Sequence, residues 1–388
     1  MEQLVRLGDV CTVVSGSTPK TSVDEYWNGD VKWITPAELD ADSYYIHDSV
    51  KHITELGRTK TGLSYMPVGT VILSSRAPIG KTAILGCEMC CNQGFKNLIC
   101  TDRIFNEYLY HFLRAKTNYL NSLGRGATFK ELSKGIVENV LIPLPAIEEQ
   151  HHIADLFASV EELIQTKKQQ LDLFDELVKS RFIELFGSLH DNEKGLDIVS
   201  IEELCTLIKD GTHQTPTYTE DTQNGFKFLS SKDVMTQKIC WDDIKYIPAE
   251  LHEKLYATIQ PKRNDILMSK NGVNYGIAAV NDTDEVFDIY VSLALLRPRT
   301  DRVNPVYLRC AINNPDTKRQ FDSSIKGIGV PNLHLGEIKK TKLLLPPRSK
   351  QNEFVAFVEQ TDKSKSAVQQ SIAELEELKK SLMQKYFG

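Results

Sequence analysis

The sequence predicts a mixed α/β (α+β) fold of two similar halves in tandem, each of which ends in one long helix. One observation is a repeat, because Leu-Pro followed by Gln at the fifth position after the proline occurs at 144–150 and at 345–351. The segments that follow both end in Phe-Gly, so a single spacing of 201 residues relates both landmarks. In addition, short apolar runs alternate with clusters of Gly, Ser, Thr and Pro, which is typical of strands joined by loops.

Each half contains the same series of elements in the same order. An apolar opening run leads into a polar loop, then into strand candidates, a short helix, a Gly-containing segment and a strand that ends in Leu-Pro. In both halves the central strand pattern ends on a basic residue, Arg76 or Lys270. In the first half these segments are 4–14, 15–21, 31–34, 68–76, 79–85, 106–114, 124–132 and 140–145, and in the second they are 199–208, 210–216, 226–229, 262–270, 275–280, 305–312, 325–333 and 342–347.

The two long segments carry apolar residues at alternating steps of four and three, the 3.5-residue period of a coiled-coil seam. Polar residues interrupt the two seams at different steps, which favours two different members of one helix pair. The alternative is two amphipathic helices that each pack on their own domain. The seam residues are Ile153, Phe157, Val160, Ile164, Lys167, Leu171, Phe174, Val178, Arg181 and Leu185 in the first helix, and Phe354, Val358, Thr361, Lys365, Val368, Ile372, Leu375, Lys379, Leu382 and Tyr386 in the second.

The composition is that of a soluble globular protein, with 41% hydrophobic and 25% charged residues in 388. No apolar run is long enough to cross a bilayer, and the first residues lack a signal-peptide core, so we expect a cytoplasmic protein. The cluster Cys87, Cys90 and Cys91 has no second His or Cys pair at zinc-site spacing. We therefore expect no metal, and free thiols for the eight cysteines.

The net charge of −6 is unevenly distributed along the chain. Residues 148–187 hold nine acids against four bases, whereas 302–350 hold ten bases against three acids. A basic segment of this kind suits contact with phosphates, although a solvated basic surface would have the same composition.

Three catalytic classes can be compared with the sequence, and it argues against each of them. Residues 75–82 resemble a phosphate-binding P-loop, but Ser75 replaces the first glycine and Pro78 removes a backbone donor. Asp316, Glu337 and Lys339 have the residue types of a metal-dependent nuclease, yet the other half has no matching acid. A methyltransferase would need a cofactor loop and a base-flipping loop that are not found here. The sequence thus indicates a binding protein rather than an enzyme.

Polar and basic residues beside flexible loops could reach phosphates or base edges, although any one of them could equally be a solvated loop residue. The predicted DNA-binding residues are Ser17, Thr18, Lys20, Arg76, Lys81, Asn92, Gln93, Arg125, Thr128 and Lys130 in the first half, and Thr212, His213, Thr215, Ser269, Lys270, Asn271, Lys326 and Asn332 in the second.

This combination of two α/β halves, Leu-Pro-x-x-x-x-Gln helices and Gly-Thr loops resembles the DNA-specificity (S) subunit of type I restriction-modification systems. The resemblance implies two target recognition domains, at 1–145 and 197–346, that read the halves of a bipartite, asymmetric duplex DNA site. It implies spacer helices at 146–187 and 347–388, paired as an antiparallel coiled coil, and a linker at 188–196. At about 1.5 Å per residue such a helix would reach roughly 60 Å, more than one turn of DNA.

The same resemblance implies a chain that is not itself an enzyme. Its partners would be double-stranded DNA, methyltransferase subunits and restriction subunits, with no membrane. S-adenosylmethionine, ATP and Mg would serve adenine methylation and cleavage in those partners, and this chain would hold no cofactor. Two alternatives stay open: a DNA-binding nuclease that uses Asp316, Glu337 and Lys339, and a protein-protein scaffold without nucleic acid.

Overall fold

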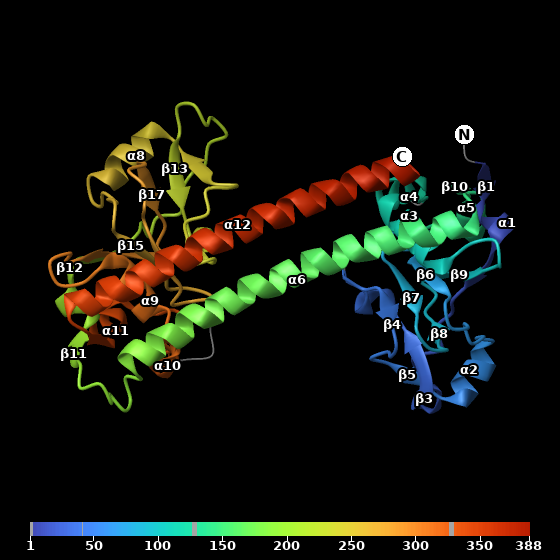
Figure 1. Ribbon diagram of the computed structural model, residues 1–388, viewed down its shortest axis with the longest axis horizontal. Helices are drawn as coiled ribbons and strands as arrows, with labels where there is room; N and C mark the ends of the chain where they lie inside the picture. The colour runs from blue at the N-terminus through green and yellow to red at the C-terminus, as the bar shows by residue number, and fades with distance from the viewer. Residues whose placement is uncertain (1–2, 41, 126–129, 326–329) are drawn as a thin grey trace. The chain divides into compact units, whose positions relative to one another are not determined.

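The repeat in the sequence is a repeat in the fold, because, apart from two short elements of the first half, η1 (Asp24–Tyr26) and β4 (Tyr45–Ile46), one order of strands and helices occurs twice in the computed structural model (Figure 1). The structure describes residues 3–40, 42–125, 130–325 and 330–388. It divides into two units: unit 1 is Met1–Gln169 with Gln369–Gly388, and unit 2 is Gln170–Val368. Each unit holds one α/β half of the sequence and one end of each long helix. The predicted mixed fold with two tandem domains is confirmed, whereas the predicted boundaries of those domains stay a prediction.

Unit 1 is built on three sheets, of which the largest has the strand order β2-β9-β6-β7-β4. Smaller sheets have the orders β5-β3-β8 and β1-β10. The strands are β1 (Leu4–Arg6), β2 (Cys11–Ser15), β3 (Trp27–Ile34), β4 (Tyr45–Ile46), β5 (His52–Ile53), β6 (Val71–Ser74), β7 (Thr82–Leu85), β8 (Cys90–Cys91), β9 (Phe95–Cys100) and β10 (Leu141–Pro143). The helices are α1 (Leu7–Val10), η1 (Asp24–Tyr26), η2 (Pro36–Glu38), α2 (Glu55–Thr61), α3 (Asn106–Ala115), α4 (Thr117–Leu123) and α5 (Lys134–Glu138).

Unit 2 repeats this plan with a four-stranded sheet of order β12-β18-β15-β16 and smaller sheets β14-β13-β17 and β11-β19. Its strands are β11 (Asp197–Ser200), β12 (Cys205–Asp210), β13 (Phe226–Leu229), β14 (Lys245–Ile247), β15 (Ile266–Ser269), β16 (Ala278–Val280), β17 (Phe287–Ile289), β18 (Leu293–Pro298) and β19 (Lys342–Leu345). Its helices are α7 (Ile201–Leu204), η3 (Ser231–Val234), α8 (Ala249–Tyr256), α9 (Pro305–Ile312), α10 (Pro315–Ser324) and α11 (Leu335–Lys340).

The central strands are continuous apolar runs because both of their faces are covered. All four residues of β6 are buried, as are all four of β15. One face of the larger sheet packs against aromatic side chains of helix α3 in unit 1 and of α9 in unit 2, where Tyr108 and Tyr307 are fully buried. The other face packs against a second, smaller apolar cluster in each unit. These layers fix the strand ends from which the loops emerge.

The long helices are α6 (Ile147–Phe186) and α12 (Arg348–Phe387), each of 40 residues. In unit 1 the ring of Phe157 stacks on Phe387 with centroids 5.7 Å apart, and Glu161 pairs with Lys379 at 2.5 Å. From the first contact to the second, the residue number increases along α6 and decreases along α12. The two helix segments in unit 1 therefore run antiparallel, as expected.

Unit 2 pairs its own two helix segments in the same antiparallel sense. Arg181 lies 3.3 Å from Glu353, and Lys365 pairs with Asp175. Every predicted seam residue is buried or half-buried. The polar seam residues Arg181, Lys365 and Lys379 each meet a carboxylate on the opposite helix of their own unit, so these three interruptions form charge pairs between the helices.

In the part of the chain that the structure describes, no helix combines the length and apolarity that a membrane span requires. All eight cysteines lie in that part, and none of them forms a disulfide.

Candidate nucleic-acid interface

One edge of the large sheet gathers several of the predicted loops in each unit. Strands β2 and β6 both run antiparallel to β9, so the ends of β2 and β6 meet the start of β9. In unit 2, β12 and β15 end where β18 begins, for the same reason. Loops that are far apart in the sequence, such as 16–23, 75–81 and 92–94, thus emerge at one edge, which we call the loop edge.

The loop edge depends on a close approach of backbone to backbone. Ser17 N donates to Cys91 O at 3.0 Å, and Thr212 N donates to Ile289 O at 3.0 Å. A Cβ atom on Gly16 would lie 2.0 Å from Asn92 O, and one on Gly211 would lie 2.3 Å from Ile289 O. Only glycine fits at these two positions, which explains why each loop begins with it.

In unit 1, part of the predicted set forms a local network. Asn92 donates from Nδ2 to Thr18 Oγ1 at 2.9 Å and accepts from Gly94 N at 2.7 Å. Lys20 and Gln93 are exposed nearby, and Ser17 is half-buried. The network holds the two loops together and leaves the exposed side chains available to a ligand.

Arg76 lies beside a residue that the sequence did not single out. Its Nε is 3.1 Å from Glu131 Oε2, and the backbone of Glu131 exchanges two hydrogen bonds with Arg125. Lys96, buried in β9, lies 3.7 Å from the same carboxylate and donates to Ser75 Oγ at 3.3 Å. Burial lowers the pKa of Lys96 because its charge loses water, and the carboxylate of Glu131 partly opposes this. The sequence signal that could have revealed the contact of Lys96 with Glu131 is the presence of a lysine within the apolar run of β9.

Unit 2 also buries a lysine at its loop edge, but from a different strand end. Lys270 follows β15 and donates from Nζ to Asp210 Oδ1 at 2.8 Å. His213 lies 3.5 Å from the other oxygen of Asp210. Asn271 forms an antiparallel bridge with the exposed Asn332, which places two amides side by side.

The backbone hydrogen bonds correct one detail of the predicted repeat. Ser75 N donates to Gly94 O at 2.7 Å, and its carbonyl accepts from Leu132 N at 2.8 Å. Lys270 makes the same two bonds, from its N to Ser292 O at 3.0 Å and from Leu333 N at 2.7 Å. Lys270 is therefore equivalent to Ser75, and not to Arg76 as the strand patterns predicted. Apolar runs do not determine which residues of the two halves are equivalent beyond a strand end. The backbone hydrogen bonds determine this.

Other predicted residues have structural contacts of their own. Lys81 donates to the carbonyls of Leu39 at 2.5 Å and Pro36 at 3.2 Å, which occupies its ammonium group within the protein. The Ser269 hydroxyl donates to Asn274 O at 2.7 Å and so closes a turn. Thr128 and Lys326 lie outside the described residues. Exposed side chains remain at Lys20, Arg76, Gln93, Arg125, Lys130, His213, Thr215 and Asn332.

A hollow of about 350 Å³ opens beside the Gly211 loop in unit 2, lined in part by Thr212, His213 and Asp288. Asp288 is buried and lies 2.7 Å from His252 Nδ1. Phe226 stacks on the imidazole with centroids 3.6 Å apart. Burial raises the pKa of Asp288, although the bond with His252 works against this. This pair was not predicted, since its members are 36 residues apart.

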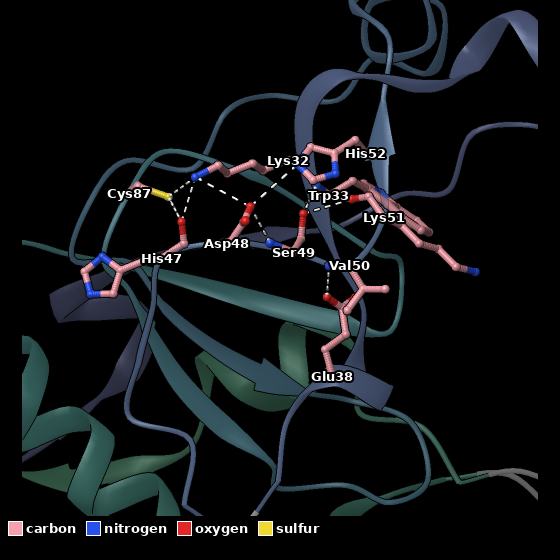
Figure 2. Close-up of polar contacts among 10 residues, drawn as sticks. All are labelled: Lys32, Trp33, Glu38, His47, Asp48, Ser49, Val50, Lys51, His52 and Cys87. Carbon is pink, nitrogen blue, oxygen red and sulfur yellow. Dashed lines mark hydrogen bonds and ion pairs between the residues drawn. The ribbon is translucent and has the colours of Figure 1, made fainter.

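Figure 2 shows a second polar cluster that the sequence did not indicate. Lys32 on β3 donates to His47 O at 2.7 Å and lies 3.6 Å from Asp48, which also lies 3.6 Å from His52. Cys87 donates from its thiol to the same carbonyl of His47 at 3.0 Å. These contacts hold the segment between β4 and β5 against β3.

The residues of the nuclease alternative make their polar contacts separately. Asp316 accepts from Leu189 N at 2.7 Å and pairs with Arg319. Glu337 lies 3.9 Å from Lys340, and Lys339 lies 3.1 Å from Glu202. Among the described residues, no group of three or more His, Cys, Asp or Glu side chains is placed to hold a metal ion.

The sequence matches a family model in two segments, one for each half. The model describes a type I restriction modification DNA specificity domain, and it matches residues 2–173 and 193–377. The chain belongs to this family.

Specificity subunits of type I restriction enzymes are similar to this chain, two of them over nearly its whole length. The MjaIX specificity subunit of Methanocaldococcus jannaschii is 29% identical over 98% of this chain and 91% of that protein. The MjaVIII specificity subunit of the same organism is 23% identical over the same shares. The EcoBI specificity subunit of Escherichia coli is 22% identical over 74% of this chain and 66% of its own length.

Solved structures with this fold come from the same kind of system. A chain from a study of complex assembly and conformational transition of the type I R-M system has a TM-score of 0.64 at 21% identity, and covers 99% of this chain and 97% of its own. The S subunit from M. genitalium has a TM-score of 0.55 at 13% identity, and covers 100% and 96%. Both likenesses support the fold of this specificity-family chain.

Proposed function

We propose that this chain is a non-catalytic specificity subunit that recognises a bipartite, asymmetric duplex DNA site through its two loop edges. Unit 1 reads one half of the site and unit 2 reads the other. Family membership supports the role of a specificity subunit. The assignment of one half-site to each unit is based on the comparison of their two loop edges.

A shared backbone frame that carries different side chains is the observation behind this proposal. Ser75 and Lys270 make the same two backbone hydrogen bonds, so the loops leave equivalent positions of the two sheets. At the next residue, unit 1 has Arg76, whereas unit 2 has Asn271. An arginine suits guanine in the major groove, and an asparagine suits adenine. The Asn271 amide oxygen is buried without a hydrogen-bond partner among the described residues, so the side chain must turn outward to make this contact. Equivalent backbone positions that carry different side chains suit the recognition of two different half-sites.

The basic groups at the edge also suit the DNA backbone. Lys20, Arg125 and Lys130 are exposed in unit 1, where they could contact phosphates and fix the orientation of the duplex. Such contacts release counterions, so affinity should fall steeply as the salt concentration rises.

Docking of methyltransferase and restriction subunits is part of the same proposal. Leu173 and Leu177 lie one turn apart on α6, outside the predicted seam, with exposed fractions of 67% and 47%. Apolar side chains left exposed in this way on a helix suit a protein interface. We assign this pair to the methyltransferase subunit.

Catalysis belongs to those partners in this proposal. S-adenosylmethionine, ATP and Mg would be bound by the partner subunits for adenine methylation and ATP-dependent cleavage, and this chain would bind none of them. A cytoplasmic location, where the partners and DNA meet, completes the proposal.

The test is selection of binding sites from a randomised duplex library by the chain assembled with its methyltransferase partner. Wild type should select two short motifs separated by a fixed gap. Arg76→Ala should relax only one motif, and Asn271→Ala only the other, at a cost of about 1–3 kcal/mol each. Arg103→Ala and Lys262→Ala are controls, because these exposed residues lie at the opposite ends of the strands in the same sheets and should leave both motifs unchanged.

Three results would contradict the proposal. Selection of a single continuous motif would remove the bipartite site. Affinity without salt dependence would favour the scaffold. DNA cleavage by the purified chain that Glu337→Ala abolishes would favour the nuclease.

A further inference from the structure

Unit 2 contains a cavity beside helix α9, apart from the loop edge. It measures about 60 Å³, and its lining comes from α9, from the segment after η3 and from the parts of α6 and α12 that belong to unit 2. This is room for several water molecules, since one needs about 10–15 Å³. Gln237, Lys238, Arg309 and Asp362 also line an open groove of about 760 Å³, so the cavity has an entrance from solvent.

Arg309 lines the cavity with a guanidinium group that has no ion-pair partner in the part of the chain that the structure describes. The residue is 8% exposed, and its Nε has no hydrogen-bond acceptor among the described residues. Its other contacts are weak: Nη1 lies 3.4 Å from Gln237 O, a long hydrogen bond, and Nη2 donates to Cys310 Sγ at 3.4 Å, a poor acceptor. An arginine stays charged in proteins, and a buried charge is costly unless it is paired. The guanidinium group therefore has N–H donors that can bind an acceptor in the cavity.

The carboxylates that line the cavity already have lysine partners. Asp362 lies 3.7 Å from Lys238, and Asp175 pairs with Lys365. Four cations and two anions line the cavity, and a third pairing is external, because Lys179 lies 2.7 Å from Glu176 outside the lining. Arg309 is thus the lining cation without a carboxylate partner among the described residues. The charged lining residues are Asp175, Lys179, Lys238, Arg309, Asp362 and Lys365.

Unit 1 satisfies the equivalent position from within the chain. Tyr108 and Tyr307 donate from their hydroxyls to Pro143 O and Leu344 O, at 2.8 and 2.7 Å, so α3 and α9 are equivalent helices. Two residues further on, Tyr110 in unit 1 stands where Arg309 stands in unit 2. Tyr110 donates to a backbone carbonyl at 2.9 Å. The surplus of donors is a property of Arg309 and not of the shared fold.

Gln237 adds a second unusual feature at the cavity. Its backbone has φ of +61°, a left-handed conformation that side chains other than glycine rarely adopt. This conformation accompanies a carbonyl directed to Arg309 and a side-chain oxygen that accepts from Asn313 Nδ2 at 3.1 Å. Strained backbone of this kind is often found at ligand sites.

We propose that this cavity binds a small oxyanion, a phosphate or a carboxylate, through the Arg309 guanidinium with Lys238 at the entrance. The planar fork of an arginine matches two oxygens of either group. The site is separate from the loop edge, so it can be present or absent whether or not the chain recognises DNA.

Thermal unfolding of the full chain tests the site, with inorganic phosphate and succinate as probes against sodium chloride at equal ionic strength. At least one of the two oxyanions should raise the melting temperature by a saturable amount that chloride does not reproduce. A response to phosphate alone assigns a phosphate ligand, and a response to succinate alone assigns a carboxylate. Binding measured by calorimetry should weaken at least tenfold in Arg309→Gln and severalfold in Lys238→Ala.

Arg319→Gln is the matched control, because Arg319 is an exposed arginine of unit 2 that pairs with Asp316. It should keep the full response. Lys238→Ala carries the test if Arg309→Gln fails to fold, since the Lys238 side chain is 54% exposed. Equal shifts in all three salts, or an unchanged response in Lys238→Ala and Arg309→Gln, would overturn the proposal and leave water as the partner of Arg309.

Discussion

Gln150 and Gln351 make the same three side-chain hydrogen bonds at the starts of the two long helices. The amide oxygen of Gln150 accepts from Phe105 N at 2.8 Å, and its amide nitrogen donates to the carbonyls of Pro145 at 3.0 Å and Arg103 at 3.1 Å. Both glutamines are 1% exposed. The repeated glutamine thus fastens the first turn of a long helix to the segment that enters α3 or α9.

Replacing either glutamine with leucine should destabilise its unit. In unit 2, Gln351 bonds to Asn304 N at 2.8 Å and to the carbonyls of Pro346 at 2.9 Å and Arg302 at 3.2 Å. Buried backbone groups left without partners cost about 1–3 kcal/mol. Urea unfolding of Gln150→Leu and Gln351→Leu should show this loss, whereas Gln169→Ala on the exposed face of α6 should change stability by less than about 0.5 kcal/mol. Losses as small as the control's would show that the bonds are dispensable.

The Glu161–Lys379 pair should stabilise the helix contact in unit 1. The two side chains are 24% and 19% exposed, so each charge is only partly hydrated. Lys379→Met should cost about 1–3 kcal/mol, less than a fully buried pair, because some solvent reaches Glu161. The exchange Glu161→Lys with Lys379→Glu should recover most of the loss in a double-mutant cycle. Lys380→Met, at a side chain 74% exposed, is the control. Additive effects without coupling would contradict this prediction.

His111 should make unit 1 less stable in mild acid. The residue is fully buried, stacks on Phe157 at 4.9 Å, and has no hydrogen-bond partner for either ring nitrogen among the described residues. Burial lowers the pKa of His111, and together with the charges of Lys379 and Arg114 it brings the value to about 3. Between pH 6.5 and 3 the unfolded chain binds a proton that the folded chain refuses, so stability falls as pH falls.

At pH 5 this single histidine should cost roughly 2 kcal/mol relative to pH 7. Urea unfolding of wild type and His111→Leu at both pH values isolates the effect, because the variant should lose this part of the pH dependence. His152→Leu, at an exposed position on α6, should keep it. An unchanged pH dependence in His111→Leu would show that another group is responsible.

Alanine at Gly16 or Gly211 should disturb one loop edge at a time. The added Cβ would lie 2.0 to 2.3 Å from a carbonyl oxygen, so the loop must move. We expect DNA affinity to fall roughly tenfold or more in each variant, which is about 1.4 kcal/mol, with the lost contacts confined to one half-site in footprinting. Gly135→Ala and Gly336→Ala are controls, because these helical glycines have open space around them and alanine favours helix. Full affinity in Gly16→Ala would contradict the assigned interface.

Lysine at both Leu173 and Leu177 should block assembly with the methyltransferase subunit and leave folding unchanged. These side chains are exposed, so the change is tolerated in the free chain but places charges in an apolar interface. Size-exclusion chromatography with light scattering measures assembly, and circular dichroism checks folding. Thr166→Lys with Gln169→Lys, at exposed positions of the same helix, adds the same charge and is the control. Normal assembly of the leucine variant would place the interface elsewhere.

The sequence by itself determined the tandem fold and the helix pair. The 201-residue repeat and the 3.5-residue period can be read from the order of residues along the chain. Helices Ile147–Phe186 and Arg348–Phe387 lie where this order predicts them. The apolar runs likewise predicted β6 and β15, because a buried strand needs apolar side chains on both faces.

Only the tertiary structure decided how the loops meet. The equivalence of Ser75 with Lys270 depends on hydrogen bonds beyond the strand ends, and apolar patterns carry no information there. The partners of Lys96 and Arg309 depend on which segments the fold brings beside them, because a buried charge is defined by its surroundings and not by its neighbours in sequence. Local periodicity therefore fixed the elements, while long-range packing fixed the chemistry at their ends.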